Sequence, residues 1–136
     1  MGLKHYPGAW RFFMCDFNTG FKPPELVKYR PVISVSNRRN DNANLCTIVP
    51  ISSTRPNVIR DFHYLLPNNE LPKHLRGRYP ESWVKIDMVT TVCFDRLNLL
   101  WVERSDRSRI YNTNRIARVH RLEISQRLTR RINFET

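Results

Sequence analysis

Short apolar runs separated by turn-forming residues constrain the fold of this chain more than any other feature of its sequence. The runs are rich in β-branched and aromatic residues, which favours strands over helices. Five of the runs are predicted as strands, at residues 9–17, 31–36, 45–51, 62–66 and 83–92. A sixth candidate strand is residues 109–111. Pro, Gly and Asn interrupt the sequence between the runs, so each strand must be short.

The connections between these runs differ in length and composition. Residues 18–29 contain Thr-Gly and Pro-Pro, which predicts a loop. Residues 38–44 read RRNDNAN, a polar turn typical of a hairpin. Residues 67–82 hold three Pro, one Gly and two adjacent Asn, which predicts a long excursion with at most a short helix.

The pattern becomes helical at the end of the chain. Between residues 114 and 132, Ile124, Leu128 and Ile132 recur every four residues, so they lie on one face of a helix. The 136 residues are enough for a single domain of mainly β class. We expect a small antiparallel barrel or strongly bent sheet with a C-terminal α-helix packed on it.

The chain is strongly basic, with 23 Lys and Arg against 12 Asp and Glu and a formal net charge of +11. A charge this large favours a polyanionic partner, since Lys and Arg that neutralise phosphates release bound counterions. Nine arginines fall within residues 104–131, beside only two acidic residues. This segment is either a solvated basic helix or a face that binds phosphates or an acidic protein.

The sequence argues against a membrane-spanning protein and against a disulfide-bonded one. No apolar run approaches the roughly 20 residues that span a bilayer, and the first ten residues lack the apolar stretch of a signal peptide. Cys15, Cys46 and Cys93 are odd in number and sit among apolar neighbours. This pattern predicts buried, reduced thiols in a cytoplasmic protein with no membrane partner.

Motifs for bound cofactors and metals are missing from the sequence. There is no Gly-rich phosphate loop, no HExxH, no paired Cys motif and no Asp-x-Asp spacing. We therefore expect no cofactor and no metal. If the chain cleaves nucleic acid, it must do so with side chains, which favours RNA because the 2′-OH supplies an internal nucleophile. Such cleavage needs a base, an acid and a fixed cation that stabilises charge on phosphorus.

Three places in the sequence offer candidates for the base, the acid and the fixed cation. Lys85 and Asp87 are two apart on the predicted strand at 83–92, so they are expected to share a face, although an ordinary surface ion pair has the same spacing. Arg30 stands where a loop enters a strand and is either a phosphate ligand or simply solvated. The third place is the end of the run at 45–51, where hydroxyl groups either contact RNA or make the turn. These residues are Ser52, Ser53 and Thr54.

Taken in order, these blocks resemble the MazF/PemK family of type II toxin–antitoxin toxins. The similarity extends from about residue 8 to residue 132 and is carried by CDF, RPVI, LCTIVPISS and WVKIDMVTTVCFDRL. The resemblance implies an SH3-like barrel of the type shared with CcdB. It also implies a homodimer whose groove binds single-stranded RNA and cleaves it without metal, leaving a 2′,3′-cyclic phosphate. An antitoxin protein would occupy the same surface.

The resemblance also implies roles for particular residues. Arg30 matches the arginine that stabilises the transition state, and Ser52 matches a hydroxyl residue in the third strand. Asp87 falls on the general-base position, and Lys85 falls where PemK-type members carry an Arg as general acid. Further RNA contacts are assigned to Lys22, Glu25, Ser53, Thr54 and Thr90.

The sequence departs from the family at two of these positions. Residues 21–25 (FKPPE) replace a loop His, and Lys22 or Glu25 are the candidates to substitute for it. Thr90 stands where many members have an Arg. Two other functions stay open at this point: a CcdB-like toxin that binds a protein target such as a topoisomerase, and a non-catalytic nucleic-acid-binding protein.

Overall fold

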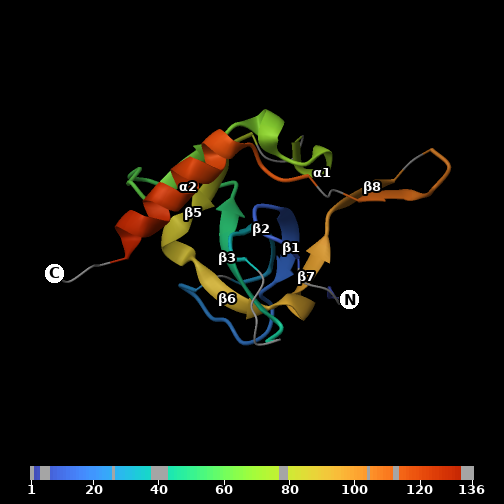
Figure 1. The fold of residues 1–136 in the computed structure, drawn as a ribbon, viewed down its shortest axis with the longest axis horizontal. Coiled ribbons are helices and arrows are strands. Elements are labelled where there is room, and N and C mark those ends of the chain that lie inside the picture. Colours follow the sequence, from blue (N-terminus) through green and yellow to red (C-terminus); the bar gives the residue numbers. More distant parts are fainter. Residues whose placement is uncertain are drawn as a thin grey trace.

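A computed structural model describes residues 2–3, 7–25, 27–37, 43–76, 80–103, 105–111 and 114–132. Seven strands form one antiparallel sheet (Figure 1): β1 (Phe12–Asp16), β2 (Tyr29–Ser34), β3 (Leu45–Ser52), β4 (His63–Leu66), β5 (Ser82–Lys85), β6 (Thr90–Cys93) and β7 (Leu97–Leu99). A second, two-stranded sheet is the hairpin of β8 (Trp101–Glu103) and β9 (Arg109–Tyr111), which projects from the rest of the structure. The helical elements in the described part are α1 (Lys73–Arg76), α2 (Arg118–Arg131) and the 3-10 turns η1 (Asn68–Glu70), η2 (Ile86–Met88) and η3 (Phe94–Arg96).

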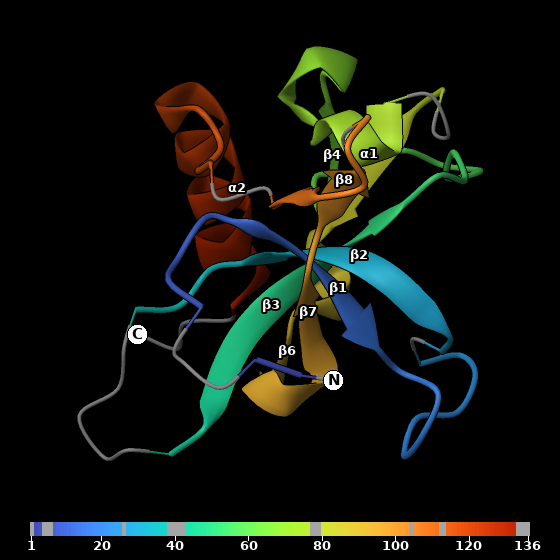
Figure 2. The ribbon, with the colours of Figure 1, turned by 90° about the vertical axis from the view of Figure 1, so that its right-hand side faces the viewer.

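This architecture confirms the prediction of a mainly β fold with a C-terminal helix. The strand order is β4-β5-β3-β2-β1-β7. β6 pairs with the first half of β3, and β5 pairs with its last two residues. Among the described residues no ladder joins β4 to β7, so closure of the predicted barrel stays a prediction. Figure 2 shows α1 and α2 at one end of the strands and the β1–β2 connection looping out at the other.

The central strands are buried on both faces, because neighbouring residues point into two different apolar clusters. Phe12, Ile33 and Val49 lie in one cluster, which Ile124 of α2 completes. Phe13, Val32 and Ile48 lie in a second cluster. This second cluster is closed by apolar residues of β6, η3 and β7, which are Val92, Phe94 and Leu97. The helices cover one face of the sheet, and its own curled strands cover the other.

The predicted strand at residues 83–92 is wrong in its middle. It is divided by η2 into β5 and β6, which pair with different halves of β3. Val84 faces Ile51 and Thr90 faces Ile48, so six steps along one strand match three along the other. The three extra residues form the 3-10 turn, an enlarged bulge that bends the strand. Lys85 ends β5, whereas Asp87 lies inside the turn, so the two do not share a strand face.

The other boundaries differ for identifiable reasons. The helix predicted from residue 114 begins at Arg118, because Ile116 N donates to Trp10 O (2.9 Å) and keeps the preceding chain extended. The candidate strand at residues 109–111 is confirmed as β9, whereas its partner β8 and the strand β7 were not predicted. The excursion at residues 67–82 contains the expected short helix, α1. Most of the predicted hairpin turn at 38–44 lies outside the described residues.

The docking of α2 gives a first testable prediction. Ile124 is fully buried against the sheet, whereas Val119 on the same helix is 60% exposed. We expect Ile124→Ala to lower the free energy of unfolding by about 2–5 kcal/mol, because it leaves a cavity beneath the helix. The matched variant Val119→Ala should change it by less than about 0.5 kcal/mol. Urea denaturation followed by circular dichroism measures both, and equal effects would contradict this packing.

Candidate functional site

Two cavities adjoin one another on either side of Met88, where β2 begins and where β3 and β5 end. The first, the Arg30 pocket, has a volume of about 290 Å³. Its polar lining residues are Glu25, Arg30, Ser52, Thr54 and Lys85. The second, the Asp87 pocket, has a volume of about 250 Å³ and is lined by Phe21, Glu25, Asp87, Met88, Val89 and Thr90. Glu25 and Met88 line both cavities, so the two form one continuous site.

Arg30 is held at the start of β2 by the main chain around it. Its Cα lies opposite Cys15 of β1, and its Nε donates to Val27 O at 2.6 Å. This bond fixes the guanidinium plane while occupying only one of its three nitrogens. Within the described part of the chain, the two terminal nitrogens have no hydrogen-bond acceptor. They can therefore meet a phosphate in the bidentate geometry that arginine favours.

The hydroxyl groups at the end of β3 stand across the same pocket. Ser52 Oγ accepts a hydrogen bond from Thr54 N (3.1 Å), so it makes the turn that ends the strand. Because a hydroxyl accepts and donates at once, Ser52 still has a proton to give to a ligand. Thr54 lines the pocket as well, whereas Ser53 is exposed and lines neither cavity. Ser52 can therefore form the turn and also donate a hydrogen bond to a ligand.

Lys85 and Asp87 lie in adjoining cavities. Lys85 faces the Arg30 pocket from the end of β5, where it pairs with His63 of β4. Asp87 lines the Asp87 pocket from η2, and no ion pair joins it to Lys85. Its Oδ1 is buried and has no hydrogen-bond partner. An unpaired buried carboxylate oxygen is costly and suits a group that accepts a proton or a hydrogen bond from a ligand.

The remaining predicted contacts divide between the two cavities and the surface. Glu25 is the residue that touches both cavities, and Thr90 lines the Asp87 pocket. Lys22 is exposed and lines neither. Sequence reasoning assigned no role to Phe21 or Met88, although both are part of the site. Only the half-exposed position of these apolar side chains beside charged neighbours identifies them.

The arginines of α2 are largely engaged with the body of the protein. Arg130 donates from Nε and Nη2 to the two carboxylate oxygens of Asp61, at 2.7 and 2.9 Å, and this contact lowers the pKa of Asp61. Arg127 donates to Asp61 O (2.6 Å), and Arg131 lies over the Phe62 ring. A phosphate-binding face on this segment would therefore rest on exposed residues such as Arg115 and Arg118.

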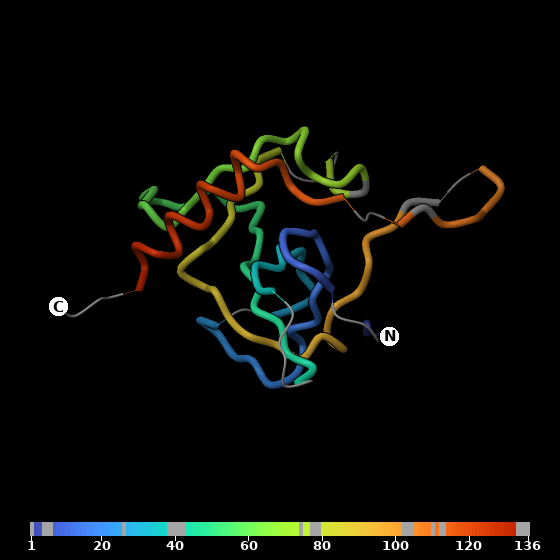
Figure 3. Tube along the Cα trace, viewed as in Figure 1, coloured from blue at the N-terminus to red at the C-terminus, as the bar shows by residue number. Residues whose placement is uncertain are grey.

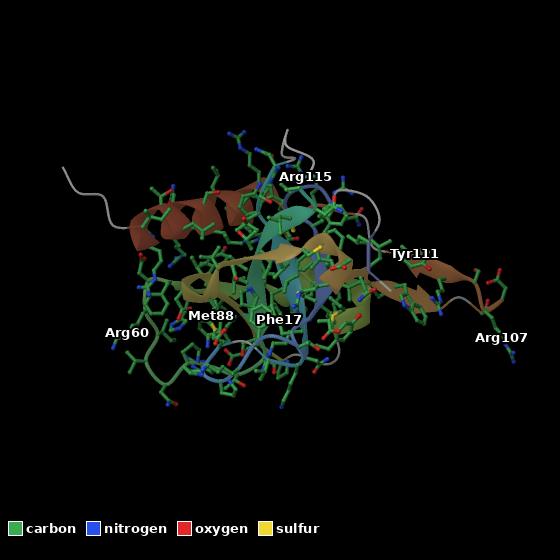
Figure 4. All side chains as sticks on the ribbon, turned by 90° about the horizontal axis from the view of Figure 1, so that it is seen from below. Phe17, Arg60, Met88, Arg107, Tyr111 and Arg115 are labelled. Atoms are coloured by element: carbon green, nitrogen blue, oxygen red, sulfur yellow. The ribbon has the colours of Figure 1, made fainter. Side chains whose placement is uncertain are left out.

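The projecting hairpin stands away from the site in this structure. Arg107 lies at its tip, far from Met88 at the cavities (Figure 4). Within the hairpin, Arg109 stacks over the Trp101 ring at 4.1 Å. Of the residues that the structure describes, none form a cluster of three or more His, Cys, Asp or Glu able to hold a metal ion. No described helix is long and apolar enough to cross a membrane.

A known protein family matches most of this chain. Residues 9–126 match the family model of the PemK-like, MazF-like toxin of type II toxin–antitoxin systems. The chain belongs to the PemK/MazF toxin family. The match covers both cavities and most of α2, and it confirms the resemblance carried by the sequence blocks.

Two known proteins are similar to this PemK/MazF chain. The putative uncharacterized protein YifN from Escherichia coli K12 is 32% identical over 88 residues, which cover 63% of this chain. The matched segment spans 58% of the length of YifN. The crystal structure of MazF (Form-I) from Deinococcus radiodurans has a TM-score of 0.62 at 18% identity, with 93% of this chain and 96% of that chain covered. At this identity the similarity establishes a MazF-like fold.

The cysteines are separate from the site and carry no disulfide. Cys15 and Cys46 are at most 2% exposed, and burial raises the pKa of each thiol to about 12. Cys93 is half-buried. The predicted buried, reduced state is thus confirmed for Cys15 and Cys46, which pack in the second apolar cluster.

This burial gives a prediction for thiol reactivity. Because the thiolate is the reactive form, raising the pKa from 9.0 to about 12 lowers its population at pH 8. We expect Cys15 and Cys46 to react with iodoacetamide about a thousandfold more slowly in the native protein than in urea. Peptide mass spectrometry after timed labelling measures each cysteine separately. Equal labelling rates in the two states would contradict the buried placement.

Proposed function

We propose that this chain is the toxin of a type II toxin–antitoxin pair and acts as a metal-independent endoribonuclease on single-stranded RNA. The observation that carries the proposal is the Arg30 pocket, where a fixed arginine, a lysine, a hydroxyl and a carboxylate converge in a PemK/MazF chain. Two cations at one cavity suit a phosphodiester, and the hydroxyls suit its oxygens. The adjoining Asp87 pocket, with Phe21 and Met88, suits a nucleobase that has left its stack.

The proposed reaction is an internal phosphoryl transfer. Asp87 removes the proton of the 2′-OH, the 2′-oxygen attacks phosphorus, and the bond from phosphorus to the 5′-oxygen breaks. Lys85 gives a proton to the departing 5′-oxygen, and the product is a 2′,3′-cyclic phosphate. Arg30 stabilises the charge that gathers on the phosphate oxygens, with Ser52 as a further donor. The unpartnered Oδ1 supports Asp87 as the proton acceptor.

Partners follow from the same proposal. The substrate is single-stranded RNA, contacted by Glu25, Thr54 and Thr90 at the two cavities and by Lys22 and Ser53 at their exposed rim. A cognate antitoxin would inhibit by covering this surface, and the net charge of +11 suits an acidic inhibitory segment. We also propose a homodimer acting in the cytoplasm, as in other toxins of this family.

Cleavage of RNA in EDTA tests the function. We expect the wild-type chain to cut single-stranded RNA and leave 2′,3′-cyclic phosphate ends. Arg30→Ala should lower kcat/KM by about a hundredfold or more, because Lys85, the other described cation that lines the two cavities, is an ammonium that cannot meet a phosphate bidentately. The matched control is Arg107→Gly at the hairpin tip, which removes the same charge far from the cavities and suits the positive φ there. Its kcat/KM should stay within about threefold of wild type.

A second pair of variants separates the two carboxylates. Asp87→Asn should lower kcat by about a hundredfold or more if Asp87 is the base, since it keeps the shape and removes the proton acceptor. Glu25→Gln should then raise KM more than it lowers kcat. The reverse result would move the base to Glu25. RNA that stays intact with the wild type, or is cut equally by Arg30→Ala, would exclude the ribonuclease and leave a binding protein or a protein-directed toxin.

A further inference from the structure

The loop between β1 and β2 supplies side chains to both cavities, yet much of it lies on the surface. Residues 18–20 and 22–25 are exposed, while Phe21 and Glu25 line the site. Among its described residues the loop has main-chain hydrogen bonds from Phe17 N to Lys28 O and from Glu25 N to Lys22 O. In Figure 3 it runs beside the chain of η2 and β6. A segment of this kind loses considerable backbone entropy when it is ordered.

Arg96, which lies more than 70 residues further along the chain, contacts this loop with its guanidinium group. Its Nη1 donates to Asp16 O (3.0 Å) and to Thr19 O (2.8 Å). The guanidinium carbon lies 5.1 Å from the centre of the Phe21 ring. Phe21 in turn meets Phe17 edge to face, with ring centres 5.1 Å apart. One planar cation therefore holds the loop through two carbonyls and one aromatic ring.

The position of Arg96 is itself well fixed. It is the last residue of η3, and the next residue, Leu97, is fully buried and pairs with Cys15 of β1. Leu3 N donates to Leu97 O at 2.9 Å and closes the turn from the other side. Gly20 adopts φ +83° beside the guanidinium, a conformation that suits glycine. The chain next to Arg96 is buried and paired with β1, whereas most of the loop is exposed, so we take Arg96 as the fixed end of the contact.

We propose that Arg96 is a positioning residue that orders the loop at residues 17–25 and so sets Phe21 and Glu25 at the two cavities before RNA arrives. Its described contacts are the carbonyls of Asp16, at the end of β1, and of Thr19, together with the Phe21 ring, so its effect reaches the RNA through the loop. Ordering the loop in advance removes an entropic cost from binding. Loss of Arg96 therefore raises KM more than it lowers kcat, whereas loss of a residue that touches the scissile phosphate lowers kcat. This kinetic part rests on the proposed ribonuclease function.

The first experiment is independent of RNA cleavage. Hydrogen–deuterium exchange is measured on peptides that cover residues 17–25 in the wild type, in Arg96→Met and in Arg76→Met. Arg76 is a matched control, because its guanidinium also donates to two main-chain carbonyls, Leu71 O (2.8 Å) and Asn69 O (3.2 Å), away from the cavities. We expect the hydrogen-bonded amides of the loop, at Phe17 and Glu25, to exchange at least about tenfold faster in Arg96→Met alone, because the loop then loses its charged hydrogen bonds to Arg96 and opens more often. Unchanged exchange in a folded Arg96→Met protein overturns the proposal.

The second experiment follows RNA cleavage and uses Arg96→Lys as the conservative variant. We expect KM to rise about tenfold or more in Arg96→Met while kcat falls by less than about threefold. Arg96→Lys should recover part of the loss, because an ammonium keeps the charge and one carbonyl contact. A fall confined to kcat would instead make Arg96 a catalytic residue and overturn the positioning role. If the wild type cuts no RNA, the proposed function fails, and the exchange measurement alone decides the role of Arg96.

Discussion

Burial of the central strands on both faces is the constraint on which the rest of this structure depends. Phe12 and Phe13 are neighbours in β1, yet they enter different apolar clusters. A sheet with two apolar faces must be shielded from water on both. In this chain the helices pack on one face, and the curled strands of the sheet itself pack on the other. Polar groups cannot lie along the middle of such strands without partners. They gather where strands begin and end, which is where Arg30 and Ser52 stand.

The three extra residues of η2 decide how the charged groups are distributed. A continuous strand would place Lys85 and Asp87 side by side, where they would neutralise one another as an ordinary ion pair. The 3-10 turn instead leaves Lys85 with Arg30 and carries Asp87 into the adjoining cavity. A cation-rich pocket and a carboxylate with an unpartnered oxygen thus arise from one local irregularity in the pairing with β3. Bulges commonly re-aim side chains in this way next to active sites.

Sequence reasoning succeeded where the deciding forces are local. The run at residues 45–51 is recognisable as a strand because its own β-branched residues favour one, and the places of Arg30 and Ser52 near strand ends follow from the runs that they flank. The division of residues 83–92 was not predictable, since the apolar spacing continues through the turn and only pairing with β3 reveals the excess. Met88 lies at both cavities because it belongs to this turn, so its place in the site was not predictable either. β7 has three residues and exists through its ladder with β1, which no local pattern encodes.

The basic composition acts in this fold mainly through the shape of the guanidinium group. Arg130 donates to both carboxylate oxygens of Asp61, and Arg76 and Arg96 each donate to two main-chain carbonyls. In these places arginine is a planar crosslinker that satisfies main-chain oxygens where the chain is irregular. The net charge of +11 favours polyanionic partners in general and does not distinguish one part of the surface from another. Arg30 differs from these crosslinking arginines, because its Nε is bound to Val27 O while, within the described part of the chain, no acceptor occupies its terminal nitrogens at the Arg30 pocket.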